Sequence, residues 1–238
     1  MVWVVAACGA PALLSACGSG SSGLSGESAP QVLSTALSSA RGIGSFDFVD
    51  KAGSGAQARV LAGQTGTVSA EQSLSGDTAA LDVRLVDHVV YLRAGSEVLE
   101  SVLGLLAPEA SAESGKWVSV PSGAKGYQEI VKTLAPAAEL DLYIPQTPLS
   151  LGATTTLHGT AVVAVTGAAP PAASTDVLRA RATLYVSTTA PYLPVGGTLT
   201  GTDVHGRTQS EVVAFTAWGV KARPPVPAGA VPVSSLRG

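Results

Sequence analysis

Cys17 is the residue of this chain whose surroundings indicate chemistry most clearly. It follows Leu14-Ser15-Ala16 and closes an apolar run of about fifteen residues that begins at Val2. Small residues before a cysteine fit the cleft of a peptidase, and the cysteine thiol is a nucleophile that can carry a thioether-linked diacylglycerol. The pattern predicts a lipoprotein signal peptide over residues 1–16 and a lipid anchor at Cys17, which becomes the first mature residue.

The apolar run has two alternative interpretations. A transmembrane helix needs ~20 apolar residues to cross the bilayer, so this run is too short. An ordinary secretory signal followed by a chance cysteine is the other interpretation. No Lys or Arg precedes the run, which departs from the usual basic start of a signal and indicates a natural start further upstream. We expect a protein held by acyl chains on the extracytoplasmic face of the cell membrane.

Other reactive side chains do not form a recognisable catalytic or metal-binding pattern. His88, His158 and His205 each lack a His, Asp or Glu three or four residues away, so we expect no metal site. Asp87-His88 and Asp203-Val204-His205 could belong to a hydrolase triad, but the chain has no Gly-x-Ser-x-Gly elbow. We therefore expect surface turns at these positions, no catalytic residues, no cofactor and no enzyme activity.

Composition excludes some classes of partner and limits what can stabilise the fold. Hydrophobic residues make up 46% and charged residues 13%, with a net charge of −3, so the basic excess expected of a nucleic-acid-binding protein is missing. The two cysteines are Cys8, inside the signal, and Cys17, so the mature domain has no thiol for a disulfide. The Gly- and Ser-rich residues 17–28 predict a flexible tether, and residues 29–238 predict one domain.

The strongest structural pattern runs from Leu81 to Arg93. With a two-residue turn at Asp87-His88, Val86 faces Val89, Leu85 faces Val90, Val83 faces Leu92 and Asp82 faces Arg93. One face of this hairpin is then wholly apolar, and Asp82 can pair with Arg93 on the other. A helix from Glu97 to Leu106, closed by Pro108, would cover the apolar face. The residues expected to line a ligand cavity between them are Leu81, Val83, Leu85, Val90, Leu92, Val98, Val102 and Leu106.

The rest of the chain alternates between helical and strand patterns. Helices are predicted over Pro30–Arg41, with Gly42 as its cap, and over Tyr127–Leu134. Strands are predicted between Gly44 and Arg93, over residues 115–120 and, after a break at Pro145–Pro148, over four segments. Those segments are Leu157–Val165, Leu178–Ser187, Gly197–Thr202 and Thr208–Trp218. The Pro-rich tail from Ala222 predicts an extended strap or edge rather than a packed element. Trp117 and Trp218 could line a ligand cavity or fill the core between sheet and helices, and the core is favoured.

Four features in this order resemble the actinobacterial lipoproteins of the LppX and LprG type, which share the LolA-like fold. They are the signal ending at Cys17, the segment Gly115-Lys116-Trp117-Val118, Leu184-Tyr185-Val186 followed by Tyr192-Leu193-Pro194-Val195, and Val213 to Gly219 before the Pro-rich end. The resemblance implies an α+β fold, in which a curved antiparallel sheet (half-barrel) carries helices over its concave face. It also implies an apolar cavity that holds acyl chains of lipids or glycolipids. Only Cys17 can be carried over as a functional residue.

Three function classes follow from these observations. A carrier that binds or transfers lipid or glycolipid acyl chains is favoured, as a monomer that exchanges lipid with an envelope transporter. A surface-anchored protein-binding or sensor module is the alternative, and an enzyme is the third class. Copurification of an apolar ligand with the soluble domain would separate the first two.

Overall fold

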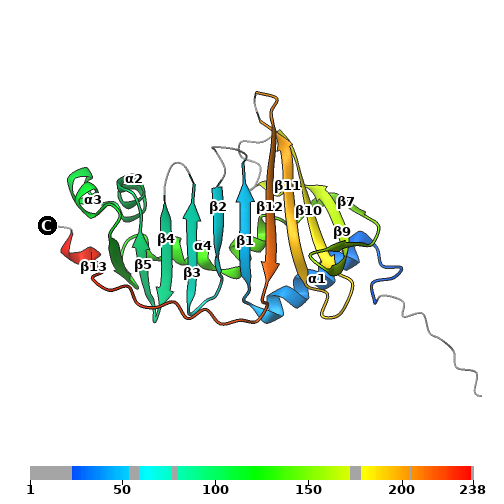
Figure 1. Ribbon diagram of the computed structural model, residues 1–238, viewed down its shortest axis with the longest axis horizontal. Helices are drawn as coiled ribbons and strands as arrows, with labels where there is room; N and C mark the ends of the chain where they lie inside the picture. Colours follow the sequence, from blue (N-terminus) through cyan, green and yellow to red (C-terminus); the bar gives the residue numbers. More distant parts are fainter. Residues whose placement is uncertain (1–22, 54–58, 77–79, 172–177, 204, 237–238) are drawn as a thin grey trace, which may run out of the picture.

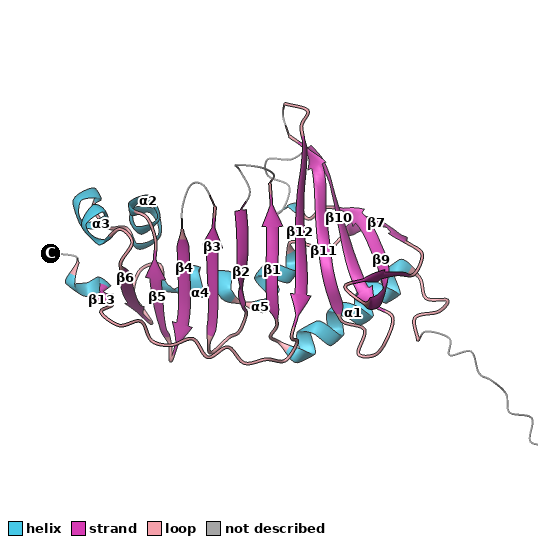
Figure 2. Cartoon of the chain, viewed as in Figure 1, coloured by secondary structure: helices cyan, strands magenta, loops and turns pink. Residues whose placement is uncertain are grey.

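The structure is a computed structural model that describes residues 23–53, 59–76, 80–171, 178–203 and 205–236. Within these ranges thirteen strands form one open sheet, and helices cover one of its faces (Figures 1 and 2). The predicted fold class, α+β with an antiparallel sheet covered by helices, is therefore confirmed. The candidate anchor Cys17 and the signal peptide lie outside the described residues.

The sheet consists of two runs of neighbouring strands joined in the middle. Its order is β13-β6-β5-β4-β3-β2-β1-β12-β11-β10-β9-β7, with β8 paired to β9 beside this path. All pairs are antiparallel except β13 with β6. The strands of the first run are β1 (Asp47–Ala52), β2 (Arg59–Gln64), β3 (Ala70–Ser75), β4 (Leu81–Val86), β5 (Val89–Arg93) and β6 (Trp117–Pro121). Those of the second are β7 (Gln146–Leu151), β8 (Thr155–Leu157), β9 (Thr160–Ala168), β10 (Leu178–Ser187), β11 (Pro194–Thr202) and β12 (Thr208–Thr216), and β13 (Val231–Pro232) follows.

The predicted hairpin is confirmed in every pair. Val86 faces Val89, Leu85 faces Val90, Val83 faces Leu92 and Asp82 faces Arg93. Asp87 and His88 both have positive φ, 47° and 62°, which is the geometry that a tight two-residue hairpin turn requires. Arg93 Nε donates to Asp82 Oδ2 at 2.8 Å, so the expected ion pair on the polar face also forms.

Helix α1 (Ala29–Ile43) extends the predicted helix at its C-terminal end. Pro30 lies in its first turn, where its missing N–H removes no helical hydrogen bond. The helix ends at Gly44, which adopts the left-handed conformation with φ 73°, so the prediction of Gly42 as the cap is wrong. Ile43 can continue the helix after Gly42, and only Gly44 has the positive φ that ends it.

The helix predicted from Glu97 to Leu106 is wrong in its extent. Helix α2 (Ser96–Val98) continues into the π-helical segment η2 (Leu99–Leu103), which ends at Gly104 with φ 68°. Pro108 does not close this helix, because it lies in the first turn of a separate helix, α3 (Ala107–Glu113). The helix α4 (Tyr127–Leu134) is confirmed, and it is followed by α5 (Pro136–Asp141), which the sequence pattern did not predict.

The second half of the sheet differs from the prediction mainly at its turns. The predicted strand Leu157–Val165 is broken at His158-Gly159, where both residues have positive φ and β8 turns into β9. The expected break at Pro145–Pro148 is mostly strand, because β7 begins at Gln146 on the outer edge of the sheet, where a proline costs no ladder bond. Strand β10 has the predicted bounds.

The Pro-rich tail forms a strap along one end of the strands and an edge strand, as predicted (Figure 1). Arg84 Nη1 donates to Pro225 O at 3.2 Å, and β13 pairs with β6. Ala222 and Val233 are nevertheless buried, at 2% exposure each, and Val233 belongs to a core cluster, so the expectation that the tail is not a packed element is wrong.

The packed domain begins before residue 29. Gly23–Gly26 forms a turn, and Leu24 is buried at 6% exposure among the side chains of α1 and the sheet. This part of the expected tether is therefore attached to the domain. In the described part of the chain, no helix combines the length and apolar character needed to cross a membrane.

Two separate hydrophobic clusters lie between the sheet and its helices. The first contains α1 with residues of β1 and β9 to β12, and the second contains η2, α3 and α4 with residues of β3 to β6. In the first cluster the ring of Tyr143, which follows α5, packs directly on Gly197 of β11. A side chain at Gly197 would have no room.

Gly197→Ala should therefore destabilise the domain. The added Cβ would lie 2.8 Å from Tyr143 Cδ1, and such overpacking of a core costs about 1 to 3 kcal/mol. Gly42→Ala is the matched control, because no atom lies within 4 Å of its added Cβ, and it should be neutral or stabilising. Urea unfolding of both variants measures the difference, and equal midpoints would contradict the close contact.

Candidate functional site

The hairpin residues proposed for a cavity lie in a packed cluster. Val83, Leu85, Val90 and Leu92 are buried, with exposures of 6%, 1%, 0% and 2%. They share the second cluster with Leu99 and Leu103 of η2. A ligand would have to displace these side chains to reach them, and their part in ligand binding stays a prediction.

The other four proposed cavity residues are not brought together in the same way. Leu81, Val98 and Val102 are half-buried and pack on the margin of the second cluster. Leu106 is 67% exposed, because it lies after Gly104 as the cap of α3 and not on the preceding helix. The helix break that the sequence pattern missed therefore removes Leu106 from this face.

A row of three half-buried leucines crosses the sheet between the two clusters. Leu61 faces Leu74 across β2 and β3, and Leu74 faces Leu81 across β3 and β4, so all three side chains lie on the helix-bearing face. Leu61 packs on the first cluster and Leu81 on the second, whereas Leu74 belongs to neither. We call these three residues the leucine strip, and it is apolar surface that the core does not bury.

The leucine strip leads directly to a group of buried acidic side chains. Asp50 of β1 faces Leu61 and is only 5% exposed, and Glu139 of α5 is 4% exposed. Asp50 Oδ1, Glu139 Oε1 and the Tyr143 hydroxyl are buried without a hydrogen-bond partner. Glu211 of β12 completes the group, and its Oε1 accepts from Arg59 Nη2 at 3.3 Å.

Burial and mutual repulsion change the protonation of this acidic group. The pKa of Asp50 is raised from 3.8 to about 8, mainly by burial and then by the neighbouring Glu211 and Glu139 carboxyls. Burial, followed by the Glu211 charge, raises the pKa of Glu139 from 4.5 to about 7. Burial also raises the pKa of Tyr143. At neutral pH, Asp50 is therefore predominantly protonated and can be accommodated next to an apolar surface.

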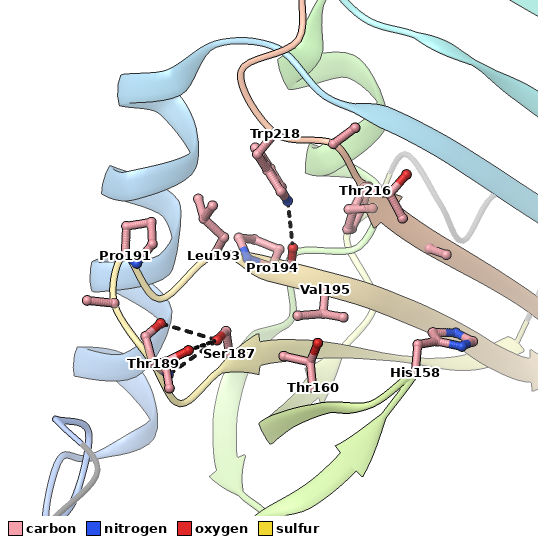
Figure 3. A pocket seen from close by; sticks show the side chains of 14 residues that line it. His158, Thr160, Ser187, Thr189, Pro191, Leu193, Pro194, Val195, Thr216 and Trp218 are labelled. Atoms are coloured by element: carbon pink, nitrogen blue, oxygen red, sulfur yellow. Dashed lines mark hydrogen bonds between the residues drawn. The ribbon is translucent and has the colours of Figure 1, made fainter. Parts of the chain in front are cut away.

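A pocket of about 560 Å³ lies at the end of β10, β11 and β12, open to solvent (Figure 3). Its walls combine apolar side chains such as Leu193, Val195 and Trp218 with the hydroxyls of Thr160 and Ser187. Trp218 Nε1 donates to Pro194 O at 3.0 Å, which fixes the indole at the side of the pocket. His158 is the one imidazole among the lining residues, and no Asp, Glu, Lys or Arg side chain lines this pocket.

The histidines and their acidic neighbours occupy turns, as predicted. Asp203 Oδ1 accepts from the backbone N–H groups of His205 and Arg207 at 2.9 Å, which closes the loop between β11 and β12. Among the described residues, no three His, Cys, Asp or Glu side chains gather closely enough to hold a metal ion.

The two tryptophans differ in their positions. Trp218 packs on Phe46, with ring centroids 4.7 Å apart, and so joins the core as expected. Trp117 does not, because Arg84 and Arg93 stack on its ring at 4.9 and 5.1 Å on the face away from the helices. The prediction of Trp117 in the core is wrong, since its strand register turns the indole toward the two arginines that alternate on the neighbouring strands.

Comparisons with known proteins identify the fold only. No family model matches the sequence, and no curated protein matches it. The crystal structure of LprF from Mycobacterium bovis matches with a TM-score of 0.53 at 15% identity, covering 84% of this chain and 97% of that one. A putative outer membrane lipoprotein-sorting protein domain from Vibrio parahaemolyticus matches with a TM-score of 0.31, at 11% identity over 79% of this chain and 92% of that one. A DUF1329 family protein from Desulfovibrio piger matches with a TM-score of 0.29, at 9% identity over 82% of this chain and 95% of that one.

The chain therefore has the fold of LprF. This likeness extends over most of both chains, and it confirms the fold that the sequence resemblance to the LppX and LprG type implied. The two matches with lower TM-scores add nothing to this conclusion. The structure defines a class of protein with an open, mostly antiparallel sheet, helices on one face of it, and an incompletely buried apolar strip between two cores.

The acidic group should make folding stability depend on pH. The folded protein holds protons on Asp50 and Glu139 that the unfolded chain releases near pH 4. The stability that these two groups contribute is therefore fully present below about pH 4 and is lost as the pH rises through their folded pKa values of about 8 and 7. Each pKa unit corresponds to about 1.4 kcal/mol, so we expect a loss of about 2 kcal/mol or more between pH 5 and pH 9.

Asp50→Asn should remove most of this loss and be more stable than the unaltered protein at pH 9. Asp141→Asn is the control, because Asp141 is an exposed carboxylate on the same helix as Glu139. Urea unfolding across this pH range measures both, and a protein equally stable at pH 5 and pH 9 would show that the carboxyls are not buried together.

Proposed function

We propose that this chain is a membrane-anchored extracytoplasmic lipoprotein that binds or transfers the acyl chains of lipids or glycolipids. Its role is binding and not catalysis. Cys17 carries the anchor, and the helix-bearing face of the sheet carries the ligand. The carrier acts as a monomer and exchanges lipid with an envelope transporter.

The observation that carries this proposal is the leucine strip. Domains of this size normally bury their facing apolar surfaces in one contiguous core. Here the helices leave two cores, and Leu61, Leu74 and Leu81 remain half-buried in register between them. An acyl chain lying along the strip would cover apolar surface that the protein itself leaves accessible.

The chemistry of this face suits an acyl chain better than a charged ligand. Each buried methylene contributes about 0.8 kcal/mol, so a long chain supplies micromolar affinity or better without headgroup contacts, even after its immobilisation cost. The strip ends at Asp50, whose neutral form adds no charge to the site at neutral pH. Headgroup selectivity should therefore be modest.

Native mass spectrometry of the soluble domain, expressed without Cys17, tests this function directly. A carrier should retain lipid from the expression host or take it up from vesicles. A domain that carries no lipid and takes none up would favour the protein-binding or sensor module instead.

Cys17→Ala should abolish acylation and release the protein from the membrane. Two or three acyl chains give stable anchoring, whereas one chain gives an association constant of only ~10⁴ M⁻¹. Fractionation and intact mass measure the outcome. A variant that remains in the membrane fraction with the normal mature mass would disprove the lipid anchor.

Leu74→Asp should lower lipid uptake with little loss of stability. Leu74 is only half-buried and lies outside both clusters, so the carboxylate can reach water, but it would oppose an acyl chain on the strip. Val49→Asp places the same charge on the opposite face of β1, where Val49 is 38% exposed, and should leave uptake unchanged.

Val83→Trp tests the packed hairpin separately from the leucine strip. Because Val83 is buried in the second cluster, the indole should cost about 1 to 3 kcal/mol of stability. The denaturant midpoint and the lipid uptake of delipidated protein are measured on the same samples. Normal uptake by Leu74→Asp would exclude the strip as the binding surface.

A further inference from the structure

The described chain begins against one particular loop. Gly23 touches the loop between β10 and β11, because a Cβ at Gly23 would collide with the hydroxyl of Tyr192. The next residue, Leu24, is buried in the first cluster with the side chains of α1. The start of the packed domain is therefore attached to the end of the sheet that carries β9 to β11 (Figure 1).

The chain between this attachment and the anchor is short. Cys17 precedes Gly23 by six residues, and six residues span at most about 20 Å even when fully extended. The main path of the sheet has twelve strands, which at about 4.8 Å per strand extend over roughly 50 Å. The loop between β10 and β11 must therefore stay close to the bilayer, whereas the end that carries β6 and β13 need not.

This loop has the chemistry of a surface that can rest on lipid. No charged residue occurs between Ala182 and Thr202, and Thr189, Ala190 and Pro191 are exposed at the tip of the loop. An uncharged tip can approach the headgroups without the cost of desolvating an ion. Tyr192 stands next to it, and tyrosine is enriched where apolar and aqueous environments meet.

The loop is also held in shape and borders the pocket. Ser187 N–H donates to Leu193 O, and Tyr192 N–H donates to Thr189 O, both at 2.9 Å. The Ser187 and Thr189 hydroxyls are hydrogen-bonded to each other at 3.0 Å, and dashed lines mark the hydrogen bonds between these two residues in Figure 3. Ala190, Pro191 and Leu193 line the pocket, so its mouth lies on the same surface as the loop.

We propose that the loop Thr188–Leu193 and the mouth of this pocket form the surface through which the anchored domain rests on the outer leaflet. Its partner is the neutral headgroup and upper acyl region of the bilayer, because neither the loop nor the pocket wall offers a charged side chain for an ionic ligand apart from His158. The proposal rests on the acyl anchor at Cys17 and is independent of whether the leucine strip carries lipid.

A single fluorescent label can test this orientation. The mature chain has no cysteine besides Cys17, whose thiol the thioether occupies, so an introduced cysteine can be labelled selectively. Ala190→Cys carries an environment-sensitive fluorophore at the tip of the loop. Ala107→Cys is the matched control, because Ala107 is also exposed and starts α3 at the opposite end of the sheet.

The acylated full-length proteins are placed in phosphatidylcholine vesicles that contain a lipid spin-labelled near the headgroup. The label at position 190 should lose fluorescence to the spin label and be protected from iodide in the water, and the label at position 107 should show neither effect. Equal quenching at the two positions, or iodide access at position 190 equal to that at 107, would overturn the proposal. Equal denaturation midpoints confirm that both labelled proteins are folded.

Mass spectrometry of Cys17 separates this proposal from the proposed function. A mature Cys17 without acyl mass would overturn both the anchor and the orientation. An acylated protein with quenching at neither or both positions would overturn the orientation alone. Selective protection of position 190 by a soluble protein without vesicles would also overturn it, since the loop would then be a protein-docking surface.

Discussion

The pairing of β1 with β12 is the interaction on which the rest of the structure depends. Six Cα pairs, from Asp47 with Thr216 to Ala52 with Glu211, join the two runs of strands into one sheet. Without these pairs, β1 and β12 would each be an unpaired edge strand in the middle of the sheet. Aromatic rings reinforce the junction, since Phe46 lies 5.2 Å from Phe215 and 4.7 Å from Trp218 between ring centroids. A contact between residues almost 170 positions apart therefore establishes the site as well as the fold.

The same two strands also carry the least favourable feature of the core. Asp50 and Glu211 stand on the helix-bearing face of β1 and β12, and Glu139 approaches from α5. Glu211 is paired with Arg59, but the buried Asp50 and Glu139 carboxyls oppose folding unless they retain their protons. Local conflicts of this kind are common at functional sites, and here the conflict lies at the end of the leucine strip.

The sequence determines the local parts of this fold better than the distant ones. The hairpin from Leu81 to Arg93 was predictable pair by pair, because strict alternation and a two-residue turn allow one register. The helix after it was predicted too long, because apolar spacing continues to Leu106 whereas the left-handed Gly104 ends the helix first. The same spacing cannot show whether a glycine will adopt positive φ.

Sequence patterns could not locate the candidate site, for a related reason. Leu61, Leu74 and Asp50 become neighbours only through the registers of β1, β2 and β3, and β2 has no clear alternation that would identify its buried face. The pocket likewise joins turns near residues 158, 190 and 217, which no local pattern connects. Signals for function in the sequence were therefore limited to Cys17 and the overall order of motifs.

The leucine strip and the loop Thr188–Leu193 with its pocket use different side chains of the sheet. Along β12, Val213 and Phe215 belong to the first cluster under the helices, whereas the alternate residues Ala214 and Thr216 line the pocket. Alternation of side chains along a strand lets one element serve both faces without a shared polar contact. A lipid on the leucine strip and a bilayer at the loop would thus be recognised by different side chains. Contact with the membrane need not empty the site, and loading the site need not lift the domain from the membrane.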